Sequence, residues 1–216
     1  MSLVFHGHPL SSYCWKVLIA LYENATPFEQ VLVDLGDPDS RAAFAALWPI
    51  AKMPVLEDRA RGEAVAETTI IIDYLDCHYP GPVRFVPEDP ELARRTRFWD
   101  RVHDLYVQGP MQKIVLDRLR GEGEHDPIGV AEARAQMATA LAMVERDLAG
   151  KSWSMGEDFT LADCAAMPAL YYADKVAPLA GTYPNALALL ERLRARPSVA
   201  RVIAEAEPYF HYFPSE

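Results

Sequence analysis

The sequence predicts an α/β domain followed by an all-helical domain. Short apolar strands alternate with helical segments in the first part of the chain, and beyond it apolar residues recur only at helical spacing. A proline-rich segment, YPGPVRFVPEDPE, separates the two patterns and cannot form a regular element. Half of the 216 residues are hydrophobic, which is enough for a sizeable core. We therefore expect an α/β domain at 1–80, a linker at 81–90 and an all-α helical bundle at 91–216.

The first domain is predicted to run strand, helix, strand, helix, hairpin, helix. A strand at Leu3 to His6 leads into the helix YCWKVLIALYEN, for which Ser11 or Ser12 is the natural N-cap, and FEQVLVDL alternates as a second strand. Asp37 to Ser40 should be a loop, RAAFAALWP a short helix, and MPVLED with EAVAE a hairpin. A last helix should run from Thr68 to His78. This βαβαββα order is that of a thioredoxin-like domain.

The second domain is expected to be a helical bundle. A long helix, LARRTRFWDRVHDLYVQ, should break or kink at Gly109 and Pro110 and then resume. Thr160, with Asp163 three residues later, predicts a capping box at the start of a central, buried helix. NALALLERLRA and SVARVIAEA predict two more helices. The aromatic tail PYFHYFP either packs back on the fold or caps a pocket.

Pro54 interrupts an otherwise regular strand, because the apolar pattern continues directly behind it. A cis bond between Met53 and Pro54 resolves this conflict and turns the Met53 backbone outward at a strand edge, where a peptide-like ligand can pair with it. Glu67 and Thr68 stand at the N-terminus of the next helix, where N–H groups and a hydroxyl converge on a carboxylate. The sequence therefore predicts two adjacent half-sites for a small anionic peptide.

Charge and composition exclude several classes of partner. A formal net charge of −10 argues against nucleic acid, and no run of Lys or Arg forms a basic stripe. No apolar run approaches a membrane span and the first residues lack the features of a signal peptide, so we expect a cytoplasmic protein without a membrane partner. Three scattered cysteines and the spacing of the histidines fit neither a disulfide framework nor a metal site.

Four motifs occur in the order seen in soluble glutathione transferases. These are SSYCWKVLIAL, FAALWPIAKMPVLED, ETTIIIDYL and FTLADCAAMPAL, and the resemblance spans essentially the whole chain. The serine-bearing first loop is similar to that of bacterial members nearest the zeta and theta classes. The chain departs from the pattern at four positions. Tyr13 stands where cysteine is expected, Trp48 where asparagine is common, Ala51 where glycine is usual and Thr68 where serine is usual.

The resemblance implies glutathione as co-substrate, no metal, and a role in detoxification. A free thiol has a pKa of about 8.5, so the protein must stabilise the thiolate. Ser11 is the first candidate to donate to the sulfur, since it takes the place of the first cysteine of a CxxC motif, and Ser12 is the alternative. Lys52 is expected to bind the glycyl carboxylate and Glu67 the γ-glutamyl group. The full set of glutathione-binding candidates is Lys52, Met53, Pro54, Glu67 and Thr68.

The second substrate is expected to be a small hydrophobic electrophile, bound where the two domains meet. Tyr106 and Met111 flank the expected kink, and either line this site or belong to the helix core. The expected function is transfer of glutathione to such electrophiles. The alternatives are glutathione-dependent isomerisation, dehalogenation or ether cleavage, and a non-catalytic binding or dimerisation protein. The resemblance also implies a two-fold homodimer.

Overall fold

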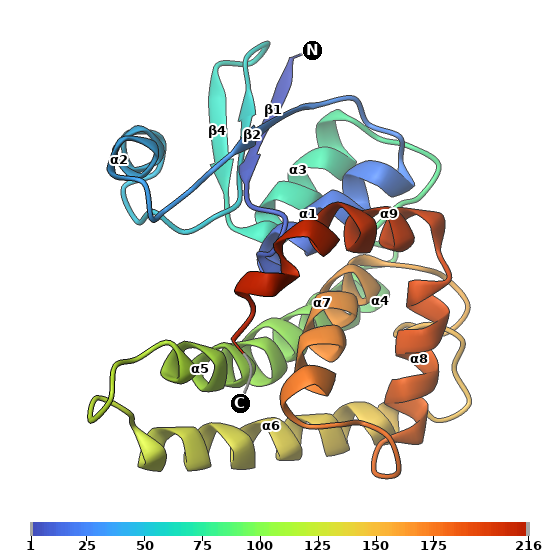
Figure 1. Ribbon diagram of the computed structural model, residues 1–216. Helices are drawn as coiled ribbons and strands as arrows, with labels where there is room; N and C mark the ends of the chain where they lie inside the picture. Colours follow the sequence, from blue (N-terminus) through green and yellow to red (C-terminus); the bar gives the residue numbers. More distant parts are fainter. Residues whose placement is uncertain (1, 215–216) are drawn as a thin grey trace.

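The computed structural model describes residues 2–214, and it folds as a thioredoxin-like domain beside a helical domain (Figure 1). This confirms the predicted fold class. Among the described residues, no helix is long and apolar enough to cross a membrane. The elements of the first domain are β1 (Leu3–Gly7), α1 (Ser12–Glu23), β2 (Glu29–Leu32), α2 (Pro38–Leu47), β3 (Val55–Asp58), β4 (Glu63–Ala66) and α3 (Thr68–His78).

Four strands form one mixed sheet in the order β2-β1-β3-β4, with β1 parallel to β2 and antiparallel to β3. Leu56 of β3 points to the face that α1 and α3 cover, whereas its neighbour Val55 packs with Phe44 of α2 on the opposite face. Figure 1 shows α2 on one side of the sheet and α1 with α3 on the other. The first turn of α1 is thereby held at the junction with the helical domain.

The second helix begins earlier than the sequence pattern predicts. Residues 37–40 were expected to form a loop, but α2 starts at Pro38. The Asp37 side chain accepts a hydrogen bond from the Ser40 N–H at 2.9 Å, and proline fits the first turn of a helix because its missing N–H has no partner there.

The helical domain contains α4 and the helices that follow it. Residues 81–89 form neither helix nor strand. The elements are α4 (Pro90–Val102), the π-helical segment η1 (His103–Gln108), α5 (Gly109–Arg118), α6 (Pro127–Asp147), α7 (Leu161–Val176), α8 (Pro184–Arg194), α9 (Pro197–Ala206) and the short 3-10 helix η2 (Glu207–Tyr212).

Of the two predicted alternatives at Gly109 and Pro110, a break is wrong, because the chain stays helical by widening its turn just before them. The Gly109 N–H donates to the carbonyl of Asp104, five residues back, and Pro110 then lies in the first turn of α5. Helical winding therefore continues from α4 through η1 into α5, with an altered phase after Val102.

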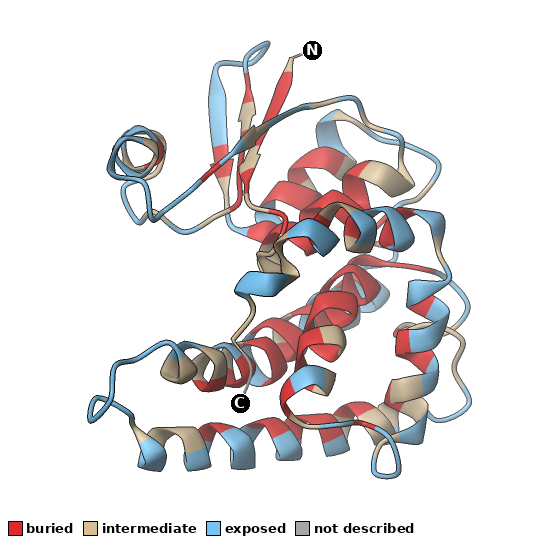
Figure 2. Ribbon diagram, in the orientation of Figure 1, coloured by how far each residue is buried: buried red, intermediate tan, exposed pale blue. Residues whose placement is uncertain are grey.

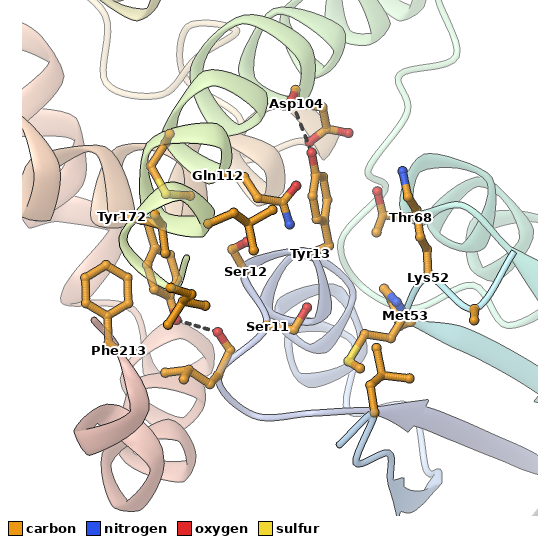
Figure 3. Close-up of a pocket in the computed structure, with 18 of the residues that line it drawn as sticks. Ser11, Ser12, Tyr13, Lys52, Met53, Thr68, Asp104, Gln112, Tyr172 and Phe213 are labelled. Carbon is orange, nitrogen blue, oxygen red and sulfur yellow. Dashed lines mark hydrogen bonds between the residues drawn. The ribbon is translucent and has the colours of Figure 1, made fainter. Parts of the chain in front are cut away.

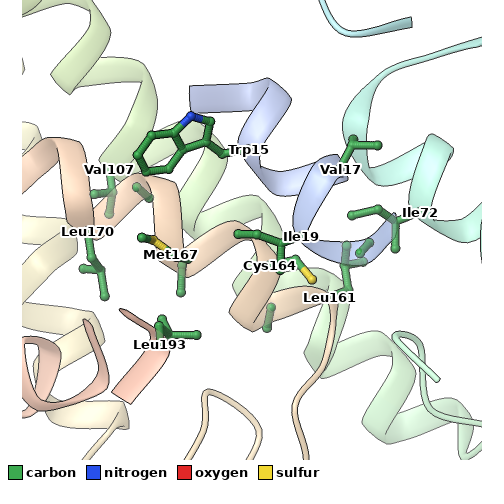
Figure 4. Close-up of a cluster of buried hydrophobic side chains, with 14 of the residues drawn as sticks. Trp15, Val17, Ile19, Ile72, Val107, Leu161, Cys164, Met167, Leu170 and Leu193 are labelled. Carbon is green, nitrogen blue, oxygen red and sulfur yellow. The ribbon is translucent and has the colours of Figure 1, made fainter. Parts of the chain in front are cut away.

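The central helix of the molecule is α7, as predicted. Thr160 and Asp163 form the capping box at its start, and nearly all of its residues are buried (Figure 2). Trp15 and Ile19 of α1 pack against Met167 and Leu170 of α7, so one apolar core runs through both domains (Figure 4). The first turn of α1 is fixed against the helical domain by this core.

Candidate active site

A cavity of about 550 Å³ lies between the two domains (Figure 3). Its walls come from the first turn of α1, the residues before β3, the start of α3, the helices α4 to α5 through η1, and the C-terminal tail. Eight of the nine predicted site residues line the cavity: Ser11, Ser12, Lys52, Met53, Pro54, Glu67, Thr68 and Met111.

Tyr106 does not take the predicted position. It is absent from the described lining and is 47% exposed, whereas the adjacent Leu105 lines the cavity. The π-helical winding of η1 shifts the phase of the helix, which turns Tyr106 outward. A sequence prediction that assumes regular α-helical spacing cannot detect this shift.

Ser11 caps helix α1. Its Oγ accepts a hydrogen bond from the backbone N–H of Cys14, with 3.4 Å between the two atoms. A hydroxyl that accepts in this way still has its own proton to donate. In Figure 3 the Ser11 side chain lies between α1 and Met53, at the positive end of the helix dipole.

Ser12 is held by the other domain. Its Oγ accepts a hydrogen bond from the Gln108 side-chain amide of η1, and Gln108 is almost completely buried. The two serines therefore have different partners, one within α1 and one across the domain junction. The sequence offered no signal for the Gln108 contact, which joins residues 96 positions apart.

Tyr13 lines the cavity beside the serines. Its hydroxyl donates to the backbone carbonyl of Asp104 at 3.3 Å, and burial, together with the charge of Asp104, raises its pKa to about 12. The phenol is therefore neutral near pH 7. Cys14, the next residue, lies in the core, where burial raises the pKa of its thiol to about 11, so it does not supply a reactive thiolate.

The opposite wall carries the residues around the proline. The Met53–Pro54 bond is cis, which confirms the prediction. The pairing of β3 with β1 and β4 begins at Val55, so Met53 lies just before the start of an interior strand and not, as predicted, on an edge strand. Lys52 is exposed on the same wall.

The start of α3 forms the third wall. Glu67 has a positive φ of 68°, an uncommon conformation for a residue other than glycine, and it stands directly before Thr68, the first residue of the helix. Strain of this kind clusters at ligand sites. Thr68 is buried while Glu67 is exposed, so the N-terminus of α3 opens on the cavity through these two residues.

A buried polar network lies behind the serines and joins the two domains. Lys16 of α1 contacts Asp100 at 2.5 Å and Asp104 at 2.7 Å, and Arg101 contacts both carboxylates. Thr69 of α3 donates to Asp100 at 2.8 Å. Burial raises the pKa of Asp104, while the Lys16 ammonium acts in the opposite direction. This network fixes α1, α3 and α4 relative to one another.

The aromatic tail both packs back on the fold and contributes to the wall of the cavity. Phe210 packs near Trp15 and Tyr172 with ring centroids 6.2 and 6.4 Å apart, whereas Phe213 lines the cavity. Tyr172 is itself fixed, because its hydroxyl donates to the carbonyl of Leu10 at 2.8 Å. Residues 2–214 contain no group of three or more His, Cys, Asp or Glu side chains that could hold a metal ion.

Comparison with known proteins identifies the family. The model of the glutathione S-transferase N-terminal domain matches residues 5–83, and that of the C-terminal domain matches residues 102–197. A glutathione S-transferase of Pseudomonas putida is 28% identical over 211 residues, which cover 95% of this chain and 93% of that protein.

Solved structures agree with the match. A glutathione S-transferase of Methylobacillus flagellatus with GSH bound has a TM-score of 0.86 and 26% identity, and covers 93% of this chain and 98% of its own. A glutathione S-transferase of Methylobacterium radiotolerans in complex with glutathione sulfonate has a TM-score of 0.82 and 30% identity, over 93% and 94% of the two chains.

The fold and the cavity between its domains define a two-domain enzyme built on a thioredoxin-like sheet. The chain belongs to the glutathione S-transferase family.

Proposed function

We propose that the protein binds glutathione in this cavity, activates its thiol as a thiolate and adds it to small hydrophobic electrophiles. The observation that carries the proposal is the position of Ser11, whose hydroxyl lies at the N-terminus of α1 with a proton available to donate. The bound GSH and glutathione sulfonate of the two solved relatives support the choice of ligand.

The cavity offers a partner for each part of the tripeptide. The γ-glutamyl group binds at Glu67 and Thr68, where the α3 N-terminus favours a carboxylate and Glu67 accepts from the ammonium. The cysteinyl backbone pairs with Met53 just before β3, and Lys52 binds the glycyl carboxylate. The sulfur then lies near Ser11. Serine-type activation of the zeta and theta kind follows from this pose.

The chemical step needs no further reactant. Binding near Ser11 lowers the pKa of the thiol, whose proton leaves to solvent, because the hydroxyl and the helix dipole favour the anion. The thiolate sulfur forms a bond to an electrophilic carbon. At a carbon that bears a leaving group, that group departs with its electron pair, and at an activated alkene the resulting carbanion takes up a proton.

A glutathione-dependent activity panel tests the proposal. It covers aryl halides, α-halo acids, maleyl compounds and aryl ethers, and so also tests isomerisation, dehalogenation and ether cleavage. Conjugation of at least one electrophile is expected. Tight glutathione binding with no turnover of any substrate would instead favour the non-catalytic alternative.

We further propose a homodimer. Apolar side chains are exposed along the adjoining helices α3 and α4 to η1, including Ile70 at 55%, Phe98 at 47% and Tyr106 at 47%. The Arg97–Asp73 ion pair at 3.0 Å shows that these helices adjoin. An exposed apolar surface of this kind is typical of an interface.

Light scattering tests the dimer. Phe98→Glu should halve the mass in solution, whereas Ile128→Glu on α6, where the side chain is 74% exposed, should leave it unchanged. A monomeric wild type would contradict the proposal.

The three cysteines are free in the described structure, and we propose a cytoplasmic location, where thiols stay reduced.

A further inference from the structure

We propose that the electrophile is an uncharged aromatic compound and that the Gln112 side-chain amide binds its electron-withdrawing polar substituent. This inference rests on the proposed function, because it assigns the substrate class of the same cavity. Three features of the cavity carry it: the distribution of charge, the free amide of Gln112 and the aromatic wall.

Charge is confined to one part of the cavity. The cations among its described lining residues are Lys52 and Arg101. Arg101 is paired with Asp100 at 2.8 Å and with Asp104 at 2.5 Å, so its charge is already compensated. Lys52 lies beside Met53 (Figure 3) and is the proposed partner of the glycyl carboxylate of glutathione, so that its charge is compensated when glutathione is bound.

The remaining part of the cavity is apolar. Its described lining residues include Leu10, Met111, Val115, Leu116 and Leu119, with the aromatic tail opposite. A carboxylate that enters this region loses water and meets no free cation, which is costly. The net charge of −10 adds to the repulsion. Anionic electrophiles such as α-halo acids and maleyl acids are therefore disfavoured.

Gln112 is the exception within the apolar region. It is an exposed residue of α5 that lines the cavity, and no protein group within residues 2–214 makes a hydrogen bond with its amide. Figure 3 shows the amide extending from its helix toward the space beside Ser12 and Tyr13. Gln108, about one turn earlier, differs because it is buried and donates to Ser12. Gln112 therefore presents a neutral polar group without a protein partner beside Ser12 and Tyr13.

An amide N–H suits a nitro, carbonyl or ether oxygen on the substrate. When a thiolate adds to an activated ring, its electron pair moves into the ring and onto such an oxygen, and returns to expel the leaving group. A donor already aimed at that oxygen stabilises the charge as it develops. Gln112 is thus assigned as a catalytic residue that touches the substrate.

The aromatic wall fixes the plane of the ring. Tyr172 and Phe213 have ring centroids 5.7 Å apart with an interplanar angle of 39°, and the Tyr172 hydroxyl is anchored on Leu10 at 2.8 Å. Flat apolar faces favour a planar substrate by stacking. A saturated aliphatic electrophile of the same volume gains less from this wall.

The test compares three substrates on four proteins. The substrates are an aryl halide activated by a nitro group, its analogue with a carboxylate in place of the nitro group, and a benzyl halide that carries no polar substituent. The proteins are the wild type, Gln112→Leu, Gln112→Arg and the control Gln136→Leu, which changes an exposed glutamine on α6.

For the wild type, kcat/KM should be higher for the nitro substrate than for its carboxylate analogue. The ratio of the two kcat/KM values should exceed the ratio of the uncatalysed rates with glutathione. Gln112→Leu should lower kcat for the nitro substrate by about 10-fold or more and lower kcat for the benzyl halide much less, since only the former places charge on an oxygen. Gln112→Arg should raise kcat/KM for the carboxylate substrate by about 10-fold. Gln136→Leu should change none of these values.

Two results would overturn the inference. One is a wild type that uses the carboxylate analogue as well as the nitro substrate after correction for intrinsic reactivity. The other is a Gln112→Leu variant with unchanged kcat for the nitro substrate. The proposed function predicts a lowered pKa of the bound glutathione thiol in all four proteins. Ultraviolet titration of the thiolate measures this pKa, so it tests glutathione activation separately from the role of Gln112.

Discussion

The ammonium of Lys16 lies 2.7 Å from the Asp104 carboxylate, and the two side chains are 0% and 8% exposed. One residue belongs to the thioredoxin-like domain and the other to the π-helical segment η1 of the helical domain. Asp104 also accepts the Tyr13 hydroxyl through its backbone carbonyl. The domain junction and the wall of the active site therefore share one residue.

Lys16→Met should destabilise the protein by about 3 kcal/mol, because it leaves Asp100 and Asp104 buried with only Arg101 to compensate them. Denaturant unfolding measures the change. Lys151→Met is the matched control, since its 2.6 Å pair with Asp147 is partly solvated, and it should cost less than about 1 kcal/mol. Equal losses in the two variants would show that the buried network does not hold the domains together.

Asp163→Ala should cost at least about 2 kcal/mol. The carboxylate accepts the N–H of Thr160 at 2.9 Å and that of Ser154 at 2.7 Å, and its removal leaves two buried donors unpaired. Asp163→Asn keeps one acceptor oxygen and should lose less. Thermal or denaturant unfolding ranks the variants, and an asparagine variant as unstable as the alanine variant would rule out the acceptor argument.

His103 should make the protein less stable in acid. Burial lowers its pKa from 6.5 to about 4, and the Lys16 charge lowers it further, whereas the Asp100 charge acts in the opposite direction. As the pH falls, His103 takes up a proton near pH 6.5 in the unfolded chain but only near pH 4 in the native state. The free energy of unfolding therefore falls as the pH drops from about 6.5 to about 4. The slope approaches about 1.4 kcal/mol per pH unit.

Denaturation curves from pH 7.5 to 4.5 check this prediction. His103→Gln should show a shallower loss of stability than the wild type over the same window, because that side chain does not titrate. Parallel curves for the two proteins would contradict the assignment to His103.

Local signals allowed much of the fold to be predicted. The bounds of α3, Thr68–His78, and the capping box of Thr160 and Asp163 match the sequence prediction, because a few neighbouring residues encode a helix start. The cis bond before Pro54 was likewise readable from a proline inside an apolar run.

Features that depend on distant contacts or on helix phase were not predictable. The Lys16–Asp104 pair joins residues 88 positions apart, and the Gln108–Ser12 hydrogen bond joins residues 96 positions apart. The π-helical winding of η1 has no clear sequence signature. It turns Tyr106 away from the cavity, and the prediction that Tyr106 lines the electrophile site therefore failed. The free amide of Gln112 became recognisable only when the cavity placed it beside the serines.

The most direct test of the account is the thiol pKa of bound glutathione, followed by ultraviolet absorbance of the thiolate against pH. In the wild type it should lie about two units below the free value, which corresponds to ~2.7 kcal/mol of stabilisation of the anion. Ser11→Ala should move it most of the way back and lower turnover by about 100-fold, with glutathione affinity largely retained. Ser12→Ala should leave the titration close to that of the wild type, because the Ser12 hydroxyl is engaged by Gln108. A Ser11→Ala protein that titrates and turns over like the wild type would contradict the assignment of Ser11 as the group that activates the thiol.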